Sequence, residues 1–197
     1  MAILDPGFLK TPRKYLVQSL LGAAVVFVLL YFVETVTHAA IVAALGSSTF
    51  IVLATPHSIM ATPRRLLGGH AVGLAVGTVG HFALLNGLFA SWASRSEVAS
   101  WVVGALAVGL ALLLMTATNT EHSPAAATAL GMVTHTWSAA TVLFIVLFAV
   151  ALVLIRWLLR RYLIDLLPVS EQLPVDFPGT VRPPKEALPP PTTGDRQ

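Results

Sequence analysis

The chain has no cysteine among its 197 residues, and only 11% of the residues are charged. The absence of thiols excludes disulfides, cysteine-ligated iron–sulfur clusters and thiol catalysis. The charged fraction is far below the roughly 25% that is typical of soluble domains, while 56% of the residues are hydrophobic. Residues 15–33 and 137–155 carry no charge and are long enough for a helix to cross a bilayer core of about 30 Å. The sequence therefore predicts an integral membrane protein.

The motifs of common enzyme classes are also missing. The sequence contains no phosphate-binding loop, no nucleophile elbow and no zinc-protease motif, and its histidines are not spaced as metal ligands. We therefore expect no enzyme, no metal and no other cofactor. The net charge of +3 comes from basic residues at the ends of hydrophobic runs and not on one helix face, which argues against binding to nucleic acid.

The hydrophobic pattern predicts an all-α, polytopic membrane protein with about six membrane segments, two of them short. These segments are residues 16–34, 39–55, 68–90, 101–118, 121–135 and 137–159. We expect residues 1–15 to be a cytoplasmic N-terminal segment, 16–165 a transmembrane domain and 166–197 a proline-rich, disordered or extended tail. The first apolar run is longer than that of a typical signal peptide, so we interpret it as an uncleaved span.

Three clusters of basic residues indicate the topology. They precede the first segment (Lys10, Arg13, Lys14), follow the second (Arg64, Arg65) and end the last (Arg156, Arg160, Arg161). If all three are cytoplasmic, as the positive-inside rule favours, both short segments cross and both termini are cytoplasmic. This topology would suit a multi-pass protein of the bacterial cytoplasmic (inner) membrane. Alternatively, the short helix that follows Pro124, about 18 Å long, re-enters the membrane without crossing it.

The two short segments resemble each other. His38–Gly46 and His122–Gly131 both begin with histidine and end in Ala-Leu-Gly. Grouped as long–short–long, residues 16–90 and 101–159 would form an inverted three-plus-three repeat, in which transporters often bind substrate at short or interrupted helices. A chance match in an alanine-rich chain is the alternative.

Polar residues gather around the second short segment. Ser123 suits an N-cap, Pro124 suits the first helical turn, and a helix N-terminus attracts anions. A histidine beside it donates hydrogen bonds or carries charge near neutral pH. A capped turn at the membrane surface is the alternative interpretation. The candidate substrate-binding residues are His122, Ser123, Pro124, Thr128, Ser47, Ser48, Thr49, His81 and Asn119.

Ionisable residues within membrane spans are rare and usually functional. The candidates for proton coupling are Glu34, His81 and His122. His70 lies close to the Arg64-Arg65 loop, and we interpret it as a residue near the membrane interface. Three glycines of the third span are spaced so that another helix can pack closely, and a homo-oligomer through them is one expected partnership. They are Gly69, Gly73 and Gly77.

Two further stretches match a known pattern. They are Thr55-Pro-His-Ser58 followed by Thr62-Pro-Arg-Arg-Leu-Leu-Gly-Gly-His70, and His122-Ser-Pro-Ala-Ala-Ala-Thr-Ala-Leu130. In their order and spacing, over about residues 15–165, they resemble the HPP family of small integral membrane proteins. Ser123 replaces the first proline of the family's His-Pro-Pro motif, and Pro124 retains the second. The resemblance implies a link to nitrite transport, with which chloroplast and cyanobacterial members are associated.

These observations lead to three competing functions. The first is a transporter or channel for a small monovalent anion, with nitrite implied by the resemblance, bound near His122-Ser123-Pro124. The second is a non-transporting membrane scaffold or interaction protein that packs through its glycine-rich span. The third is an intramembrane enzyme that uses its histidines, for which no paired nucleophile and base is apparent. The expected partners are the lipid bilayer and a small anion.

Overall fold

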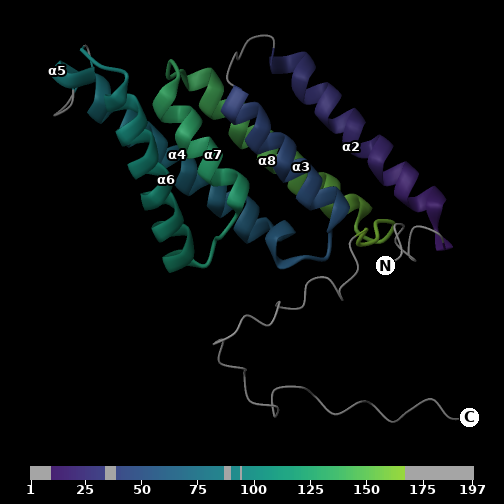
Figure 1. The fold of residues 1–197 in the computed structure, drawn as a ribbon. Helices are drawn as coiled ribbons and strands as arrows, with labels where there is room; N and C mark the ends of the chain where they lie inside the picture. The colour runs from purple at the N-terminus through teal and green to yellow at the C-terminus, as the bar shows by residue number, and fades with distance from the viewer. Residues whose placement is uncertain (1–9, 34–38, 87–89, 94, 167–197) are drawn as a thin grey trace, which may run out of the picture. The chain divides into compact units, whose positions relative to one another are not determined.

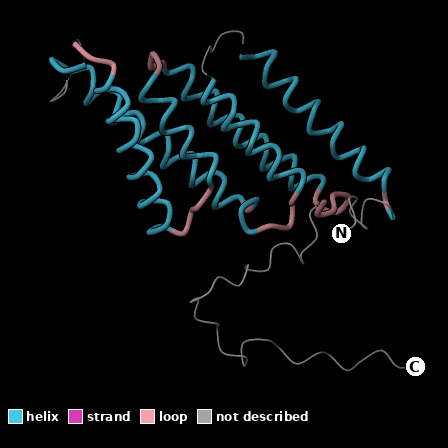
Figure 2. Tube along the Cα trace, in the orientation of Figure 1, coloured by secondary structure: helices cyan, strands magenta, loops and turns pink. Residues whose placement is uncertain are grey.

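The computed structural model describes residues 10–33, 39–86, 90–93 and 95–166, and these ranges are helical apart from short connections (Figures 1 and 2). The elements are α2 (Pro12–Val33), α3 (Ala39–Ala54), the 3-10 helix η1 (Ile59–Ala61), α4 (Pro63–Asn86), α5 (Ala90–Ala93), α6 (Val98–Thr118), α7 (Ser123–Thr134) and α8 (Ala139–Leu159). No strand occurs within the described ranges. The prediction of an all-α membrane protein is confirmed. Glu34 and residues 167–197 of the predicted tail lie outside the described residues.

The six predicted segments coincide with α2, α3, α4, α6, α7 and α8. Within the described residues, three helices are long and apolar enough to cross a membrane, over Pro63–Leu84, Val98–Thr118 and Ala139–Leu159, and α3 is a shorter apolar helix. The predicted start of the third segment at residue 68 is wrong by five residues, because α4 begins at Pro63. Proline is favoured in the first helical turn, where its missing N–H costs nothing. The helix therefore includes two arginines that a hydropathy pattern excludes.

The helices α2, α3, α4, α6, α7 and α8 alternate in direction along the chain (Figure 1). Among the described elements, α7 packs against α3, α4 and α6, whereas α2 packs mainly against α3. In addition, α4 contacts α6 and α8. The short helix α7 is therefore surrounded by three neighbours, and its side chains form much of the protein interior.

The three basic clusters lie at one end of the helix assembly. The amide of Gln18, near the start of α2, donates to the carbonyl oxygens of Leu53 (2.7 Å) and Ile164 (2.8 Å), which lie near the ends of α3 and α8. Arg64, in the first turn of α4, donates to the carbonyl oxygen of Thr118 at the end of α6 (3.0 Å). These bonds join α2 to α3 and to the segment after α8, and α4 to α6, at the same end. This is the arrangement on which the predicted topology depends.

The glycines of α4 bring this helix into close contact with α7. A Cβ at Gly69 would lie 2.6 Å from Cβ of His122, and one at Gly77 would lie 2.6 Å from the carbonyl oxygen of Ala129. At Gly73, the carbonyl oxygen of Ala125 occupies the space that a Cβ would need. The predicted close packing of another helix is confirmed, and that helix is α7 of the same chain. While α7 is in place, these glycines are not available to a second copy.

Candidate functional site

Four polar side chains from three parts of the chain meet in the protein interior. They are Ser48 of α3, His70 of α4, His122 immediately before α7 and Thr128 of α7. None of the four is more than 2% exposed. His70 is the eighth residue of α4, about 10 Å along the helix axis from Pro63. We call these four residues the histidine–serine cluster.

Hydrogen bonds connect the whole histidine–serine cluster. Oγ of Ser48 lies 3.0 Å from Nε2 of His70 and 2.9 Å from Nε2 of His122. The other ring nitrogens point outward: Nδ1 of His70 lies 3.0 Å from Oγ1 of Thr128, and Nδ1 of His122 lies 3.2 Å from the carbonyl oxygen of Met60. The two imidazole rings are 5.2 Å apart between centroids and inclined by 61°. One serine hydroxyl therefore bridges two buried histidines.

Local backbone geometry places His122 in the histidine–serine cluster. Asn119 adopts a left-handed conformation (φ 54°, ψ 47°) at the end of α6, which asparagine tolerates better than most residues. His122 is extended (φ −141°, ψ 96°) and precedes the first turn of α7. Its Cβ passes close to Gly69, where any side chain would collide with it. His122 can therefore take this position only because Gly69 of α4 has no side chain.

The predicted N-cap is wrong by one residue. His122 is the N-cap of α7, its side chain makes no capping hydrogen bond, and Ser123 is already helical. The imidazole Nδ1 interacts instead with the carbonyl oxygen of Met60 in η1. Because the first N–H groups of a helix have no partner within the helix, Pro124 is tolerated at the second helical position as well as at the first.

The connection before α7 is held to the start of α4 by arginines. Nη1 of Arg65 forms an ion pair with Glu121, and Nη2 of the same guanidinium donates to Oδ1 of Asn119. The Arg65 side chain is 14% exposed and that of Glu121 is 33% exposed, so the pair lies at the rim of the interior. The predicted site residue Asn119, three residues before His122 in the chain, therefore has a structural role.

Three of the predicted site residues, Ser48, His122 and Thr128, belong to the histidine–serine cluster. The sequence analysis missed the fourth, His70, because it interpreted this residue as interfacial. In the structure His70 is 2% exposed and lies two turns inside α4, which begins five residues before the predicted segment. Recognising Pro63 as the helix start would have revealed its depth.

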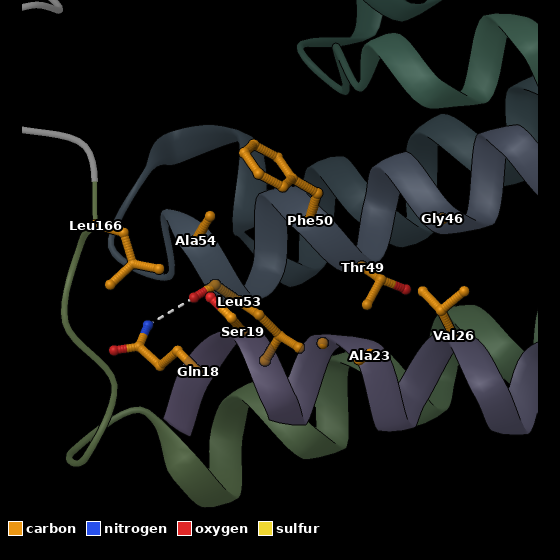
Figure 3. Close-up of a pocket in the computed structure, with 11 residues that line it drawn as sticks. Gln18, Ser19, Ala23, Val26, Gly46, Thr49, Phe50, Leu53, Ala54 and Leu166 are labelled. Carbon is orange, nitrogen blue, oxygen red and sulfur yellow. Dashed lines mark hydrogen bonds between the residues drawn. The ribbon is translucent and has the colours of Figure 1, made fainter. Parts of the chain in front are cut away.

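The structure separates other predicted site residues from this group. His81 lies about 16 Å farther along α4, and its buried Nδ1 has no hydrogen-bond partner among the described residues. The hydroxyl of Thr49 donates to the carbonyl oxygen of Leu45 (2.9 Å) in its own helix. Thr49 lines an apolar pocket of about 370 Å³ between α2 and α3, next to Val26 and Phe50 (Figure 3). Neither residue touches the bridging hydroxyl of Ser48.

A second pocket, of about 440 Å³, lies between α3 and the first turn of α7. We call it the α3–α7 pocket. The predicted site residues Ser47, Ser123 and Pro124 line it, together with Ala43, Ala44, Phe50, Ile51 and Ala127. Ser123 follows His122 directly, and the carbonyl oxygen of Ala44 lies 3.0 Å from Oγ of Ser48. The pocket wall is therefore shared with the histidine–serine cluster. Among the described residues, no group of three potential metal ligands occurs.

Comparison with known proteins gives the family. The model of the HPP transmembrane region matches residues 9–165. The chain belongs to the HPP family. A transmembrane protein of Dictyostelium discoideum is 38% identical to this HPP protein over 92 residues, which are 46% of this chain and 28% of that relative. The chain thus spans well under a third of the relative's length. No solved structure matches it.

The two stretches that carry the HPP resemblance pack against each other in the structure. Gly69 of the first contacts His122 of the second, and His70 is hydrogen-bonded to Thr128. The serine that replaces the first proline of the family motif lines the α3–α7 pocket. The resemblance in sequence therefore corresponds to one continuous site in this HPP protein.

Proposed function

We propose that this HPP protein is a transporter or channel for a small monovalent anion, with nitrite as the first candidate. The α3–α7 pocket is the observation that carries the proposal. It lies beside the N-terminal turn of α7, where the helix dipole favours negative charge. Ser47 and Ser123 supply hydroxyls, and the remaining lining is apolar and without ionised groups. Such a lining suits a singly charged, weakly hydrated anion better than a metal or a multiply charged one.

The arrangement of helices supports a transporter with inverted repeats. In this proposal α2, α3 and α4 form one copy, and α6, α7 and α8 form the other. α2 packs on α3 as α6 packs on α7, and α4 contacts α7 as α8 contacts α3. The two short helices α3 and α7 contact each other between the copies, where inverted-repeat transporters bind their substrates. The end that carries the basic clusters faces the cytoplasm of a bacterial inner membrane.

Flux into proteoliposomes tests the proposal. A panel of nitrite, nitrate, formate, bicarbonate and chloride identifies the anion, and His122→Ala is compared at equal amounts of reconstituted protein. Loss of a buried hydrogen-bonding group beside the pocket lowers nitrite flux roughly tenfold or more. His57→Ala is the matched control, because His57 is exposed on the connection between α3 and α4, is paired with Asp165 and does not line the pocket. Wild-type flux in His122→Ala would remove this residue from the mechanism.

Single cysteines distinguish the transporter from a scaffold, and the natural sequence needs no cysteine removed first. Ser47 and Ser123 are both exposed at the α3–α7 pocket. In a transporter the pocket contains water, so Ser47→Cys and Ser123→Cys react with a membrane-impermeant thiol reagent from at least one side. A scaffold leaves this surface in contact with lipid. Absence of labelling from both sides, together with no flux of any of the five anions, would overturn the proposal.

A further inference from the structure

We propose that the histidine–serine cluster is a proton-binding site that takes up one proton on His122 and couples it to the anion in the α3–α7 pocket. The coupling rests on the proposed function, whereas proton binding does not. The proposal follows from the number of hydrogens that the observed contacts require, from the lack of a fixed counter-ion on the described helices around the cluster and from the wall shared with the pocket.

The contacts of the histidine–serine cluster need one more hydrogen than its neutral side chains supply. Two neutral imidazoles and two hydroxyls contribute four hydrogens. Five contacts within hydrogen-bonding distance surround these side chains. They are His122 Nδ1 to Met60 O (3.2 Å), His122 Nε2 to Ser48 Oγ (2.9 Å), Ser48 Oγ to Ala44 O (3.0 Å), His70 Nε2 to Ser48 Oγ (3.0 Å) and His70 Nδ1 to Thr128 Oγ1 (3.0 Å). In the neutral state one contact therefore lacks its hydrogen.

Because a carbonyl oxygen cannot donate, the two contacts to carbonyl oxygens show which of the five contacts lacks its hydrogen. A carbonyl oxygen only accepts, so Nδ1 of His122 carries a hydrogen toward Met60. The carbonyl oxygen of Ala44 likewise accepts from the hydroxyl of Ser48. His70 donates from Nε2 to Ser48 and accepts at Nδ1 from Thr128. The contact between Nε2 of neutral His122 and Oγ of Ser48 is left without a hydrogen.

One added proton completes the set when it binds Nε2 of His122. The imidazolium then donates to Met60 from Nδ1 and to Ser48 from Nε2, while the Ser48 hydroxyl keeps donating to Ala44. No other bond has to form or break, and the cluster gains one positive charge. A proton on His70 would not have this effect, because Nε2 of His122 and Oγ of Ser48 would still face each other without a hydrogen. The geometry therefore assigns the proton to His122.

The described helices around the histidine–serine cluster contain no carboxylate that could neutralise that charge. Among the described residues, η1, α3, α6 and α7 contain no Asp, Glu, Lys or Arg. The nearest acid in sequence, Glu121, is already paired with Arg65. Arg64 and Arg156 donate to backbone carbonyls, and His81 lies about 16 Å from His70 along α4. In this proposal a mobile anion in the pocket lined by Ser123 acts as the counter-ion of protonated His122.

Nitrogen NMR of the whole protein, labelled at histidine and held in lipid nanodiscs, tests the proton site. His122→Gln and His70→Gln assign the two ring signals by their loss. At alkaline pH His122 is expected as the neutral Nδ1–H form and His70 as the neutral Nε2–H form. On acidification one of the two, His122, gains a proton. Ser48→Ala removes the bridging hydroxyl and shifts both signals, whereas Thr49→Val, which removes the hydroxyl of a neighbouring buried residue, leaves them in place.

The coupling is tested by repeating the titration with nitrite. Bound nitrite should favour protonated His122 by about tenfold, and by reciprocity nitrite should bind about tenfold more tightly when His122 is protonated. An inward pH gradient should then accelerate nitrite uptake into proteoliposomes. If His122 stays neutral throughout, or if the tautomers are the reverse of those expected, the proton site is refuted, even where nitrite flux upholds the proposed function. If His122 titrates but no anion crosses or affects it, the proposed function and the coupling both fail, and proton binding stands.

Discussion

The close approach of α4 and α7 predicts the effect of adding one methyl group at Gly77. In Gly77→Ala the new Cβ would lie 2.6 Å from the carbonyl oxygen of Ala129 and 2.6 Å from Cβ of Met132. Ordinary contact begins at about 3.4 Å, so the two helices must part by about 0.8 Å. A change of side-chain rotamer cannot relieve this contact, because a carbonyl oxygen and a Cβ move only with the backbone of α7.

The energetic cost follows from this separation. A gap of 0.5–1 Å removes roughly a quarter to a half of the dispersion attraction between facing atoms. Overpacking of this kind destabilises proteins by about 1–3 kcal/mol, and we expect a loss of this size in the free energy of unfolding of Gly77→Ala. The same separation lengthens the 3.0 Å contact between His70 and Thr128, which joins the same two helices.

Unfolding in mixed micelles, followed by tryptophan fluorescence, measures this loss. The indole of Trp137 donates to the hydroxyl of Thr78, which is adjacent to Gly77 in sequence, so its emission reports on this region (3.2 Å). Gly109→Ala is the matched control. No atom lies within 4 Å of a Cβ at that position, and alanine is the better helix former by up to about 1 kcal/mol. Its stability should equal or slightly exceed that of the wild type.

A direct comparison of the stabilities of the two alanine variants tests the position of α7 against α4. If Gly77→Ala unfolds at the same denaturant concentration as Gly109→Ala, the backbone of α7 does not lie where the structure places it. The assignment of His122 and Thr128 to a common site with His70 would then lose its support, since all three depend on this helix contact.

Two further substitutions test how the ends of the helices are held. Gln18→Leu leaves the carbonyl oxygens of Leu53 and Ile164 without a donor, so the free energy of unfolding should fall by about 1–3 kcal/mol. The amide of Ile164, which donates to Gln18, should exchange its hydrogen faster, and unchanged protection would refute the role of Gln18. Ser19→Ala, at the exposed neighbouring position, is the control. Arg65→Gln removes the partner of Glu121 and should lower the free energy of unfolding by roughly 1 kcal/mol, a modest value because the pair is partly exposed. Arg64→Gln should have a smaller effect, because the side chain of Arg64 is exposed. Equal effects of the two substitutions would contradict this ranking.

The sequence by itself determined the class of protein and the positions of its helices. Low charge and long apolar runs suffice for this, because a bilayer imposes a minimum length on each spanning helix. The helix starts were less predictable. The extension of α4 back to Pro63 places Arg64 and Arg65 inside a helix, whereas hydropathy places them in a loop.

The sequence also singled out the residues of one site without showing how they meet. His122, Ser48 and Thr128 were chosen for their polarity beside short apolar segments, and the glycines of α4 for their four-residue spacing. Neither pattern predicts that α7 packs against the glycines, or that Cβ of His122 lies close to Gly69. Close packing between helices depends on the shapes of both surfaces, and a single sequence gives only one-dimensional spacing.

The tertiary structure alone decided that one hydroxyl joins two histidines. Ser48 is 22 residues from His70 and 74 residues from His122 along the chain, so no local pattern relates them. The contact forms because the glycines of α4 admit α7 and because the extended backbone of His122 turns its imidazole inward. The sequence supplied the membrane helices and the polar residues, and the packing of α3, α4 and α7 made of them a single buried network.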